Sequence, residues 1–156
     1  MNIVKSFGLV AHDHMKNELI DWALTNWETI YKHRLTCTGT TGRLVEEALR
    51  KKLIENKIDP KILNINCLKS GPLGGDQQLG ALISENKIDI LVFFWDPMLP
   101  QPHEVDVKAL LRIAVVYNIP VANNRSTADF LVTSCYFSQS YTPKTKDFSA
   151  YLNRTL

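Results

Sequence analysis

The feature that most constrains the fold is a run of eight residues, Ile88 to Trp95, in which Asp89 is the only polar side chain. A strand that is apolar on both faces is typical of a parallel sheet, because such sheets carry helices on each side. Consecutive parallel strands must be joined by a long crossover, which is usually a helix. The run therefore predicts an α/β protein.

The spacing of apolar residues changes repeatedly along the chain, from the pattern of strands to that of helices. After Ile3–Ala11, for example, Met15, Leu19, Trp22 and Ala23 recur at helical intervals. Strands that alternate with helices imply right-handed crossovers and a mostly parallel sheet. We expect strands at residues 3–11, 35–38, 62–68, 88–95 and 120–122, a helix after each, and a surface strand with a terminal helix within 136–156.

Composition bounds the class of protein. The 156 residues fit one domain with a real core, so we expect a single domain over residues 1–156. The net charge of +2, with acids and bases interspersed, gives no electrostatic reason to expect nucleic acid as a partner. No apolar run approaches the ~20 residues of a membrane span, and the segment from Met1 to Lys5 lacks the plan of a signal peptide. Three cysteines without C-x-x-C spacing are expected to be reduced core thiols of a cytoplasmic protein: Cys37, Cys67 and Cys135.

Four polar stretches each follow a predicted strand. In open parallel sheets, ligands bind at the carboxyl ends of the strands, so these stretches are expected to meet at one edge. No single stretch would suffice to predict a site, but four at corresponding positions do. They are His12-Asp13, Thr38–Gly42, Ser70–Asp76 and Asp96–Asp106.

The segment from Ser70 to Gln78 is the most unusual of these stretches. Three glycines and a proline in six residues exclude the interior of a helix or strand, and Leu79, Leu82 and Ile83 then begin a helical pattern. A glycine-rich loop at a helix start lets a ligand approach the backbone and offers free N–H groups to an anion. Asp76 ends this loop, either as a functional carboxylate or as an ordinary N-cap.

The threonine-rich turn from Thr38 to Gly42 offers hydroxyls and backbone N–H groups at another helix start, which suits a phosphate. A plain threonine N-cap explains the same residues. Lys16 is either a cationic clamp on the same anion or a solvated lysine. The chain lacks the Walker pattern and the dinucleotide fingerprint, so the turn favours a small phosphate ester over a nucleotide.

Carboxylates and histidines gather at the same predicted edge. A metal site is conceivable from them, but their spacing matches no known ligand set. A metal-free pair, with an Asp base and a His that moves protons on oxygen, is the simpler hypothesis, and Asp76 with His103 is the candidate pair. The alternative for His103 is a surface residue. The other candidates are Asp13, Asp96 and Asp106 among the carboxylates, and His12 and His14 among the histidines.

At these residues the sequence resembles the methylglyoxal synthase family. The resemblance covers most of the chain, and its most specific part is the Gly-Gly-Asp-Gln-Gln string followed later by Pro-His-x-x-Asp. The matching segments are 9–16, 38–42, 70–78, 80–84, 93–97 and 101–110.

The resemblance implies both a fold and a reaction. The fold is a three-layer α/β/α arrangement around a five-stranded parallel sheet of order 3-2-1-4-5. The reaction converts dihydroxyacetone phosphate to methylglyoxal and inorganic phosphate, without a cofactor or metal. Asp76 would be the base, His103 the group that moves protons between substrate oxygens, and Asp106 a further catalytic carboxylate. Asp13 and Asp96 would support them. The substrate or its phosphate would be held by His12, Lys16, Thr38, Gly39, Thr40, Thr41, Ser70, Gly71 and His103.

The resemblance also implies a homohexamer with sites near subunit boundaries, and inorganic phosphate as product and inhibitor. Three features depart from the family pattern: a long segment at residues 49–68, Asn123 in place of a threonine, and a loosely matched tail in which Arg154 is the candidate for an arginine that joins a neighbouring site.

Two rivals stay open. One is a non-catalytic regulatory domain of the same fold that binds a phosphate effector. The other is an isomerase or aldolase acting on a triose phosphate, for which Lys69 is the candidate lysine.

Overall fold

Five parallel strands form one sheet in the computed structural model, which describes residues 3–155. The strand order is β3-β2-β1-β4-β5, so the expected topology is confirmed. Leu9 lies opposite Cys37 on one side and Val92 on the other, which places β1 at the centre of the sheet. The strands are β1 (Ser6–Ala11), β2 (Arg34–Cys37), β3 (Asn64–Cys67), β4 (Ile90–Phe94) and β5 (Val121–Ala122).

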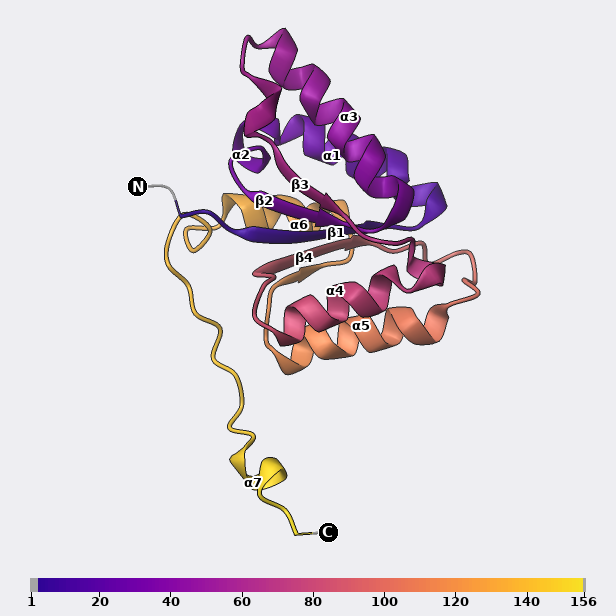
Figure 1. The fold of residues 1–156 in the computed structure, drawn as a ribbon, viewed down its shortest axis with the longest axis vertical. Helices are drawn as coiled ribbons and strands as arrows, with labels where there is room; N and C mark the ends of the chain where they lie inside the picture. The colour runs from indigo at the N-terminus through magenta and orange to yellow at the C-terminus, as the bar shows by residue number, and fades with distance from the viewer. Residues whose placement is uncertain (1–2, 156) are drawn as a thin grey trace.

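Helices cover both faces of the sheet (Figure 1). One face carries α1 (Lys16–Thr25), α2 (Trp27–Ile30), α3 (Gly39–Glu55) and α6 (Arg125–Thr133). The other carries α4 (Gly75–Ser84) and α5 (Glu104–Val116). Short 3-10 turns, η1 (Asp13–Met15), η2 (Pro60–Ile62) and η3 (Gly71–Leu73), lie between elements, and α7 (Ser149–Leu152) lies in the tail.

The apolar run that predicted the sheet is buried on both sides. Val92 and Phe94 of β4 pack into the core beneath α1, α3 and α6, whereas Leu91 and Phe93 pack into the core formed with α4 and α5. All four side chains are fully buried. This two-sided burial is the physical reason that the run carries no alternating polar residues.

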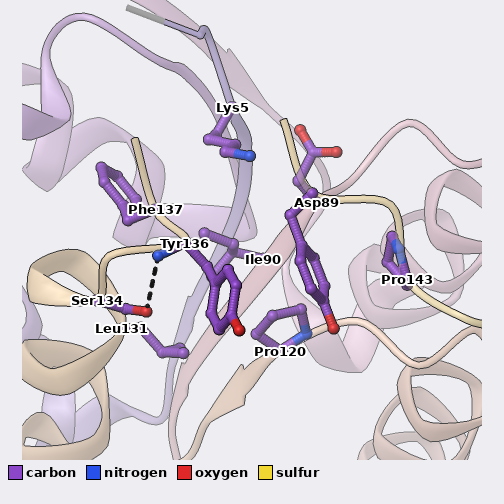
Figure 2. Close-up of a pocket in the computed structure, with 10 residues that line it drawn as sticks. Lys5, Asp89, Ile90, Pro120, Leu131, Ser134, Tyr136, Phe137 and Pro143 are labelled. Carbon is purple, nitrogen blue, oxygen red and sulfur yellow. Dashed lines mark hydrogen bonds between the residues drawn. The ribbon is translucent and has the colours of Figure 1, made fainter. Parts of the chain in front are cut away.

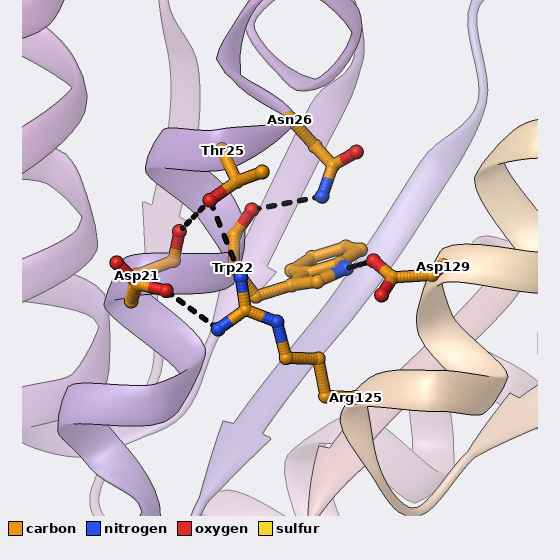
Figure 3. A network of polar contacts seen from close by, with 6 residues as sticks. All are labelled: Asp21, Trp22, Thr25, Asn26, Arg125 and Asp129. Atoms are coloured by element: carbon orange, nitrogen blue, oxygen red, sulfur yellow. Dashed lines mark hydrogen bonds and ion pairs between the residues drawn. The ribbon is translucent and has the colours of Figure 1, made fainter.

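A polar network fixes α6 against α1 (Figure 3). The fully buried indole of Trp22 donates from Nε1 to Asp129 at 3.0 Å, which satisfies its only polar atom. Arg125 donates to Asp21 at 2.5 Å and to Thr25 at 3.3 Å. These hydrogen bonds hold α6 in place against α1.

The tail differs from its prediction. Residues 141–148 form no strand and leave the body of the molecule as an extended segment, although the expected terminal helix is present as α7 (Figure 1). The predicted surface strand is therefore wrong, because the segment lacks a partner strand among the described residues. The side chain of Asn118 donates to the carbonyl of Lys144 at 3.1 Å.

Two other expectations are corrected. Cys37 is buried, but Cys67 and Cys135 are exposed, so only one cysteine is a core thiol. Cys67 is exposed because β3 is the edge strand of the sheet. The long 49–68 segment forms the end of α3, the turn η2 and β3, and Arg50 ties it together by donating to Glu46 and to the carbonyl of Pro60. Among residues 3–155, no helix has the length and apolar character needed to cross a membrane.

Candidate active site

The four predicted stretches meet at the carboxyl edge of the sheet and enclose a cavity of about 170 Å³. β1, β2, β3 and β4 each supply the segment that follows the strand. Their convergence agrees with the rule for ligand sites in open parallel sheets. The predicted residues that line the cavity are His12, Asp13, Lys16, Thr38, Gly39, Thr40, Thr41, Ser70, Gly71, Asp76 and His103.

Two predicted carboxylates do not line this cavity. Asp96 lies beneath it, where its backbone N–H donates to His12 Nδ1 at 3.1 Å and its carboxylate accepts from the backbone of Met98. Asp106 lines a separate depression between α4 and α5, which Asp76 also lines. Asp96 affects the cavity through its contact with His12, and Asp106 does so through its charge near Asp76.

His12 is held in one tautomer. Because its Nδ1 accepts from the Asp96 backbone, the proton of the neutral ring lies on Nε2. Burial lowers the pKa of His12, and the neighbouring His103 lowers it further, although Asp96 and Asp13 oppose the shift. Nε2 is buried without a hydrogen-bond partner among the described residues. His12 therefore offers an N–H donor to whatever occupies the cavity.

Asp76 and His103 form the other polar pair of the cavity. His103 Nε2 lies 3.5 Å from Asp76 Oδ2, and Asp76 is 2% exposed. Within residues 3–155, neither oxygen of Asp76 nor Nδ1 of His103 has a hydrogen-bond partner. Burial raises the pKa of Asp76 and Asp106 adds to the shift, whereas His103 opposes it. A buried carboxylate without donors is a stronger base than an exposed one.

The close approach of this pair depends on Gly71. A Cβ at this position would lie 2.9 Å from His103 Nε2 and about as close to the carboxylate of Asp76, at 3.1 Å and 3.2 Å from its oxygens. Those distances are shorter than ordinary contacts. Glycine therefore leaves the space in which the two catalytic candidates face each other.

The threonine turn forms the opposite wall. Thr38 and Thr41 are buried, and no side chain caps the amino end of α3. The N–H of Gly39 donates to the carbonyls of Leu68 and Lys69, so the N–H groups open to an anion are those of Thr40 and Thr41, which have no acceptor among the described residues. Lys16 Nζ donates to Thr40 Oγ1 and to Asp13, both at 2.6 Å. Gly39 adopts a φ of +49°, and a Cβ there would lie 2.8 Å from the backbone of Ser70, so glycine is required for the turn to meet the glycine-rich loop.

A second cavity, of about 180 Å³, lies at the opposite edge, where β1, β4 and β5 begin (Figure 2). Its lining is largely aromatic and aliphatic, with the rings of Tyr136 and Tyr141 5.5 Å apart. Its charged groups hold the chain together: Lys5 Nζ donates to the carbonyl of Gln139, and Asp89 accepts from the backbone of Ser6, each at 2.7 Å. This cavity lacks the unpartnered acid and base of the first.

Sequence reasoning named no role for several residues that line the first cavity. Gln101 and Pro102 come from the loop before α5, Val10 and Ala11 from the end of β1, and Pro72 from η3. Their neighbours in sequence, His103, His12 and Gly71, were predicted. The available signals were adjacency along the chain and membership of the segments 9–16, 70–78 and 101–110 that carry the family resemblance. Within the described part of the chain, no group of three or more His, Cys, Asp or Glu side chains is arranged to hold a metal ion.

These features define a class of protein. An α/β fold places an aspartate, two histidines, a lysine and a turn rich in threonine around one small cavity. The chain belongs to the MGS-like domain family, whose model matches residues 18–123.

Proteins of similar sequence and structure match this chain over nearly its full length. The chain is 55% identical over 158 residues to a methylglyoxal synthase of Maridesulfovibrio salexigens, with all of both chains covered. It is 50% identical to one of Yersinia enterocolitica, over 97% of this chain and 92% of the relative. The crystal structure of methylglyoxal synthase from Elizabethkingia anophelis superposes with a TM-score of 0.85 at 43% identity, covering 98% of this chain and 93% of that one.

Proposed function

We propose that the chain is an enzyme that converts dihydroxyacetone phosphate to methylglyoxal and inorganic phosphate in the cavity at the carboxyl edge. The observation that carries the proposal is the buried, unpartnered carboxylate of Asp76 beside His103, facing a pocket suited to phosphate. Full-length similarity to proteins named methylglyoxal synthase supports the same reaction.

Substrate binding starts with the phosphate. The hydroxyls of the threonine turn, the backbone N–H groups of Thr40 and Thr41, and Lys16 would hold it, with Ser70 and Gly71 on the facing loop. Hydrogen bonds to a charged group are the stronger kind, so they orient the rest of the molecule. The three-carbon chain then extends toward Asp76 and His103.

Proton removal comes next. Asp76 takes a proton from the hydroxymethyl carbon next to the ketone, and the electron pair moves to the carbonyl oxygen to form an enediolate. The Nε2–H of His12 and the ring of His103, whose centroids lie 5.9 Å apart, would donate to the developing oxyanion. The neutral state of His12 suits this role because the neutral ring already carries a proton on Nε2 and can donate it in a hydrogen bond without first gaining another, as the neutral histidine of triosephosphate isomerase does.

Elimination follows: phosphate leaves with the C–O bonding electrons and an enol remains, which becomes methylglyoxal by losing its hydroxyl proton and taking up a proton at the carbon that carried the phosphate. The C–O bond to phosphate must lie perpendicular to the enediolate plane, because its orbital then overlaps the π electrons that expel phosphate. An enzyme that holds this bond in the plane isomerises the triose, and one that aligns it eliminates. Anchoring the phosphate on one wall and the carbons on the other provides control over this torsion. His103 moves protons between the substrate oxygens.

The test is incubation with dihydroxyacetone phosphate after extensive chelation, with separate assays of dicarbonyl and released phosphate. Formation of both in equal amounts supports the proposal and its independence of metal. Binding of phosphate without turnover would identify a regulatory domain, and glyceraldehyde 3-phosphate without released phosphate an isomerase. Lys69 is exposed and lies outside the cavity lining, which disfavours an aldolase.

Inorganic phosphate should compete with substrate if the threonine turn and Lys16 form one pocket. Replacing Lys16 or the exposed Thr40 with alanine should weaken the binding of inorganic phosphate by roughly 1.5–3 kcal/mol for each charged hydrogen bond lost. Isothermal titration with phosphate measures the change. Lys108→Ala, which removes an exposed lysine on α5, is the matched control. Unchanged affinity in both pocket variants would place the phosphate elsewhere.

The pH dependence of kcat/KM should show an acidic limb governed by Asp76. Its pKa lies above the ordinary aspartate value of about 3.9 because of burial, and the base works only when deprotonated. Activity is therefore expected to be complete at higher pH and to fall, as pH decreases, before an ordinary aspartate would protonate. Steady-state kinetics across the acid range measures the limb, and circular dichroism checks that the protein stays folded there. A limb at or below the ordinary value would contradict Asp76 as the base.

We also propose that the chain acts in the cytoplasm as a single domain and assembles as a homohexamer. Three exposed apolar side chains in the segments that also supply the cavity lining, Leu73, Met98 and Val105, support assembly through this region. Light scattering should give six times the 17.7 kDa of one chain. A fully active monomer would refute it. Arg154 and Asn123 have no role assigned by their contacts.

A further inference from the structure

Two cysteines lie side by side directly beneath the phosphate pocket. Cys37 ends β2 and Cys67 ends β3, and the two are partners in the parallel register. Residues directly opposite in neighbouring strands point to the same face and lie about 4.8 Å apart, within the Cα separation of about 4.4–6.8 Å that disulfides adopt.

The helix above them leaves room for the two side chains. A Cβ at Gly42 of α3 would lie 2.7 Å from Cys67 Sγ and 3.0 Å from Cys37 Cβ. Both side chains thus converge on a position of α3 that lacks a side chain. Cys67 is exposed on the edge strand and Cys37 is buried, so the pair has one thiol within reach of solvent.

We propose that Cys37 and Cys67 form a reversible disulfide under oxidation, and that this bond weakens phosphate binding in the cavity. The cavity part of this inference rests on the phosphate site of the proposed function and not on its reaction, whereas the disulfide itself rests on neither.

The reaction is thiol–disulfide exchange with a small-molecule disulfide. The thiolate of Cys67 attacks one sulfur of the oxidant and releases the first thiolate, which leaves a mixed disulfide. Cys37 then loses its proton, attacks Cys67 Sγ and releases the second thiol. The protein gives up two electrons and two protons, and the oxidant takes them up as two thiols.

The order of attack follows from the surroundings of the two thiols. Burial raises the pKa of both, far more for Cys37, while Arg43 offsets part of the shift at Cys67. The exposed Cys67 is therefore the first nucleophile, and deprotonation of Cys37 limits the second step. The rate of bond formation should increase as pH rises.

The bond would act on the pocket through the ends of the two strands. Disulfide Cβ atoms lie about 3.8 Å apart, closer than the strand spacing, so the side chains must be drawn together and the strand ends must twist. Thr38 follows Cys37 directly, and the N–H of Gly39 donates to the carbonyl of Lys69 at 3.0 Å. Both walls of the phosphate pocket therefore move with the cysteines.

The experiment uses the full chain carrying Cys135→Ser, which removes the third, exposed cysteine. It is incubated with glutathione disulfide at neutral and alkaline pH, and non-reducing peptide mapping identifies the bond. Titration with inorganic phosphate, before and after oxidation, measures the affinity of the pocket for phosphate. We expect one linked peptide joining Cys37 to Cys67 and an increase of about tenfold in the dissociation constant of phosphate, the equivalent of one lost charged hydrogen bond, reversed by dithiothreitol. Cys67→Ser is the matched control and should show neither effect.

Each possible outcome of this experiment tests one part of the proposal. A mixed disulfide at Cys67 that never advances to Cys37, or bonds only between chains, overturns the disulfide. A Cys37–Cys67 bond with unchanged phosphate affinity overturns the effect on the pocket. If the bond forms and phosphate affinity falls but the reduced protein does not turn over dihydroxyacetone phosphate, the proposed function fails and this inference stands.

Discussion

Asp76→Asn is expected to lower kcat by a factor of roughly 10² to 10⁴, the usual contribution of a general base. Asparagine keeps the shape of the side chain but cannot accept the proton from the substrate carbon. Asp76 has no hydrogen-bond partner among the described residues, so the substitution should leave the surrounding structure unchanged. Initial-rate kinetics with dihydroxyacetone phosphate measures the loss, and titration with inorganic phosphate should show that the pocket still binds its anion.

The matched control is Asp106→Asn, which removes the same charge from outside the cavity. Asp106 raises the pKa of Asp76, so its removal should shift the acidic limb of kcat/KM to lower pH and reduce kcat far less. Equal losses in the two variants, or near-normal turnover in Asp76→Asn, would remove Asp76 from the role of base.

Gly71→Ala is expected to reduce kcat about 10²-fold, as displacements of about 1 Å at a catalytic group do. The new Cβ would come 2.9 Å from His103 Nε2 and within 3.2 Å of both oxygens of Asp76. These side chains must move apart, so the acid–base pair is lost while both residues remain present. Steady-state kinetics measures kcat, and thermal unfolding shows whether the fold persists.

Gly80→Ala is the control for the effect of alanine itself. Gly80 lies inside α4, where a Cβ would meet Ile113 at the ordinary distance of 3.7 Å. Alanine is favoured over glycine in a helix by about 1 kcal/mol, so this variant should keep full activity and lose no stability. If Gly71→Ala were as active as Gly80→Ala, the close approach at Gly71 would have no part in catalysis.

Much of the fold was predictable because it depends on local patterns. The uninterrupted apolar run at β4 required helices on both faces, and Val92 and Leu91 indeed pack into opposite cores. Element ends were less accurate: β3 begins at Asn64 because Asp59 caps the preceding turn by accepting from the backbone of Lys61. The tail segment, with no neighbouring strand, could not be assigned from its aromatic composition.

The sequence predicted most of the residues that line the candidate cavity, but it did not predict their geometry. Glycine-rich and threonine-rich stretches after strands determined which residues meet at the carboxyl edge, because parallel topology brings strand ends together.

Only the tertiary structure decided how those residues act on one another. Asp96 lies below the cavity and sets the tautomer of His12 from 84 positions away. The raised pKa of Asp76 comes chiefly from burial by segments that are distant in sequence. The pairing of Cys37 with Cys67 depends on strand register, which apolar spacing does not specify between strands. Residue types and local order are properties of the sequence, whereas distances, solvent exclusion and register arise only when remote segments pack together.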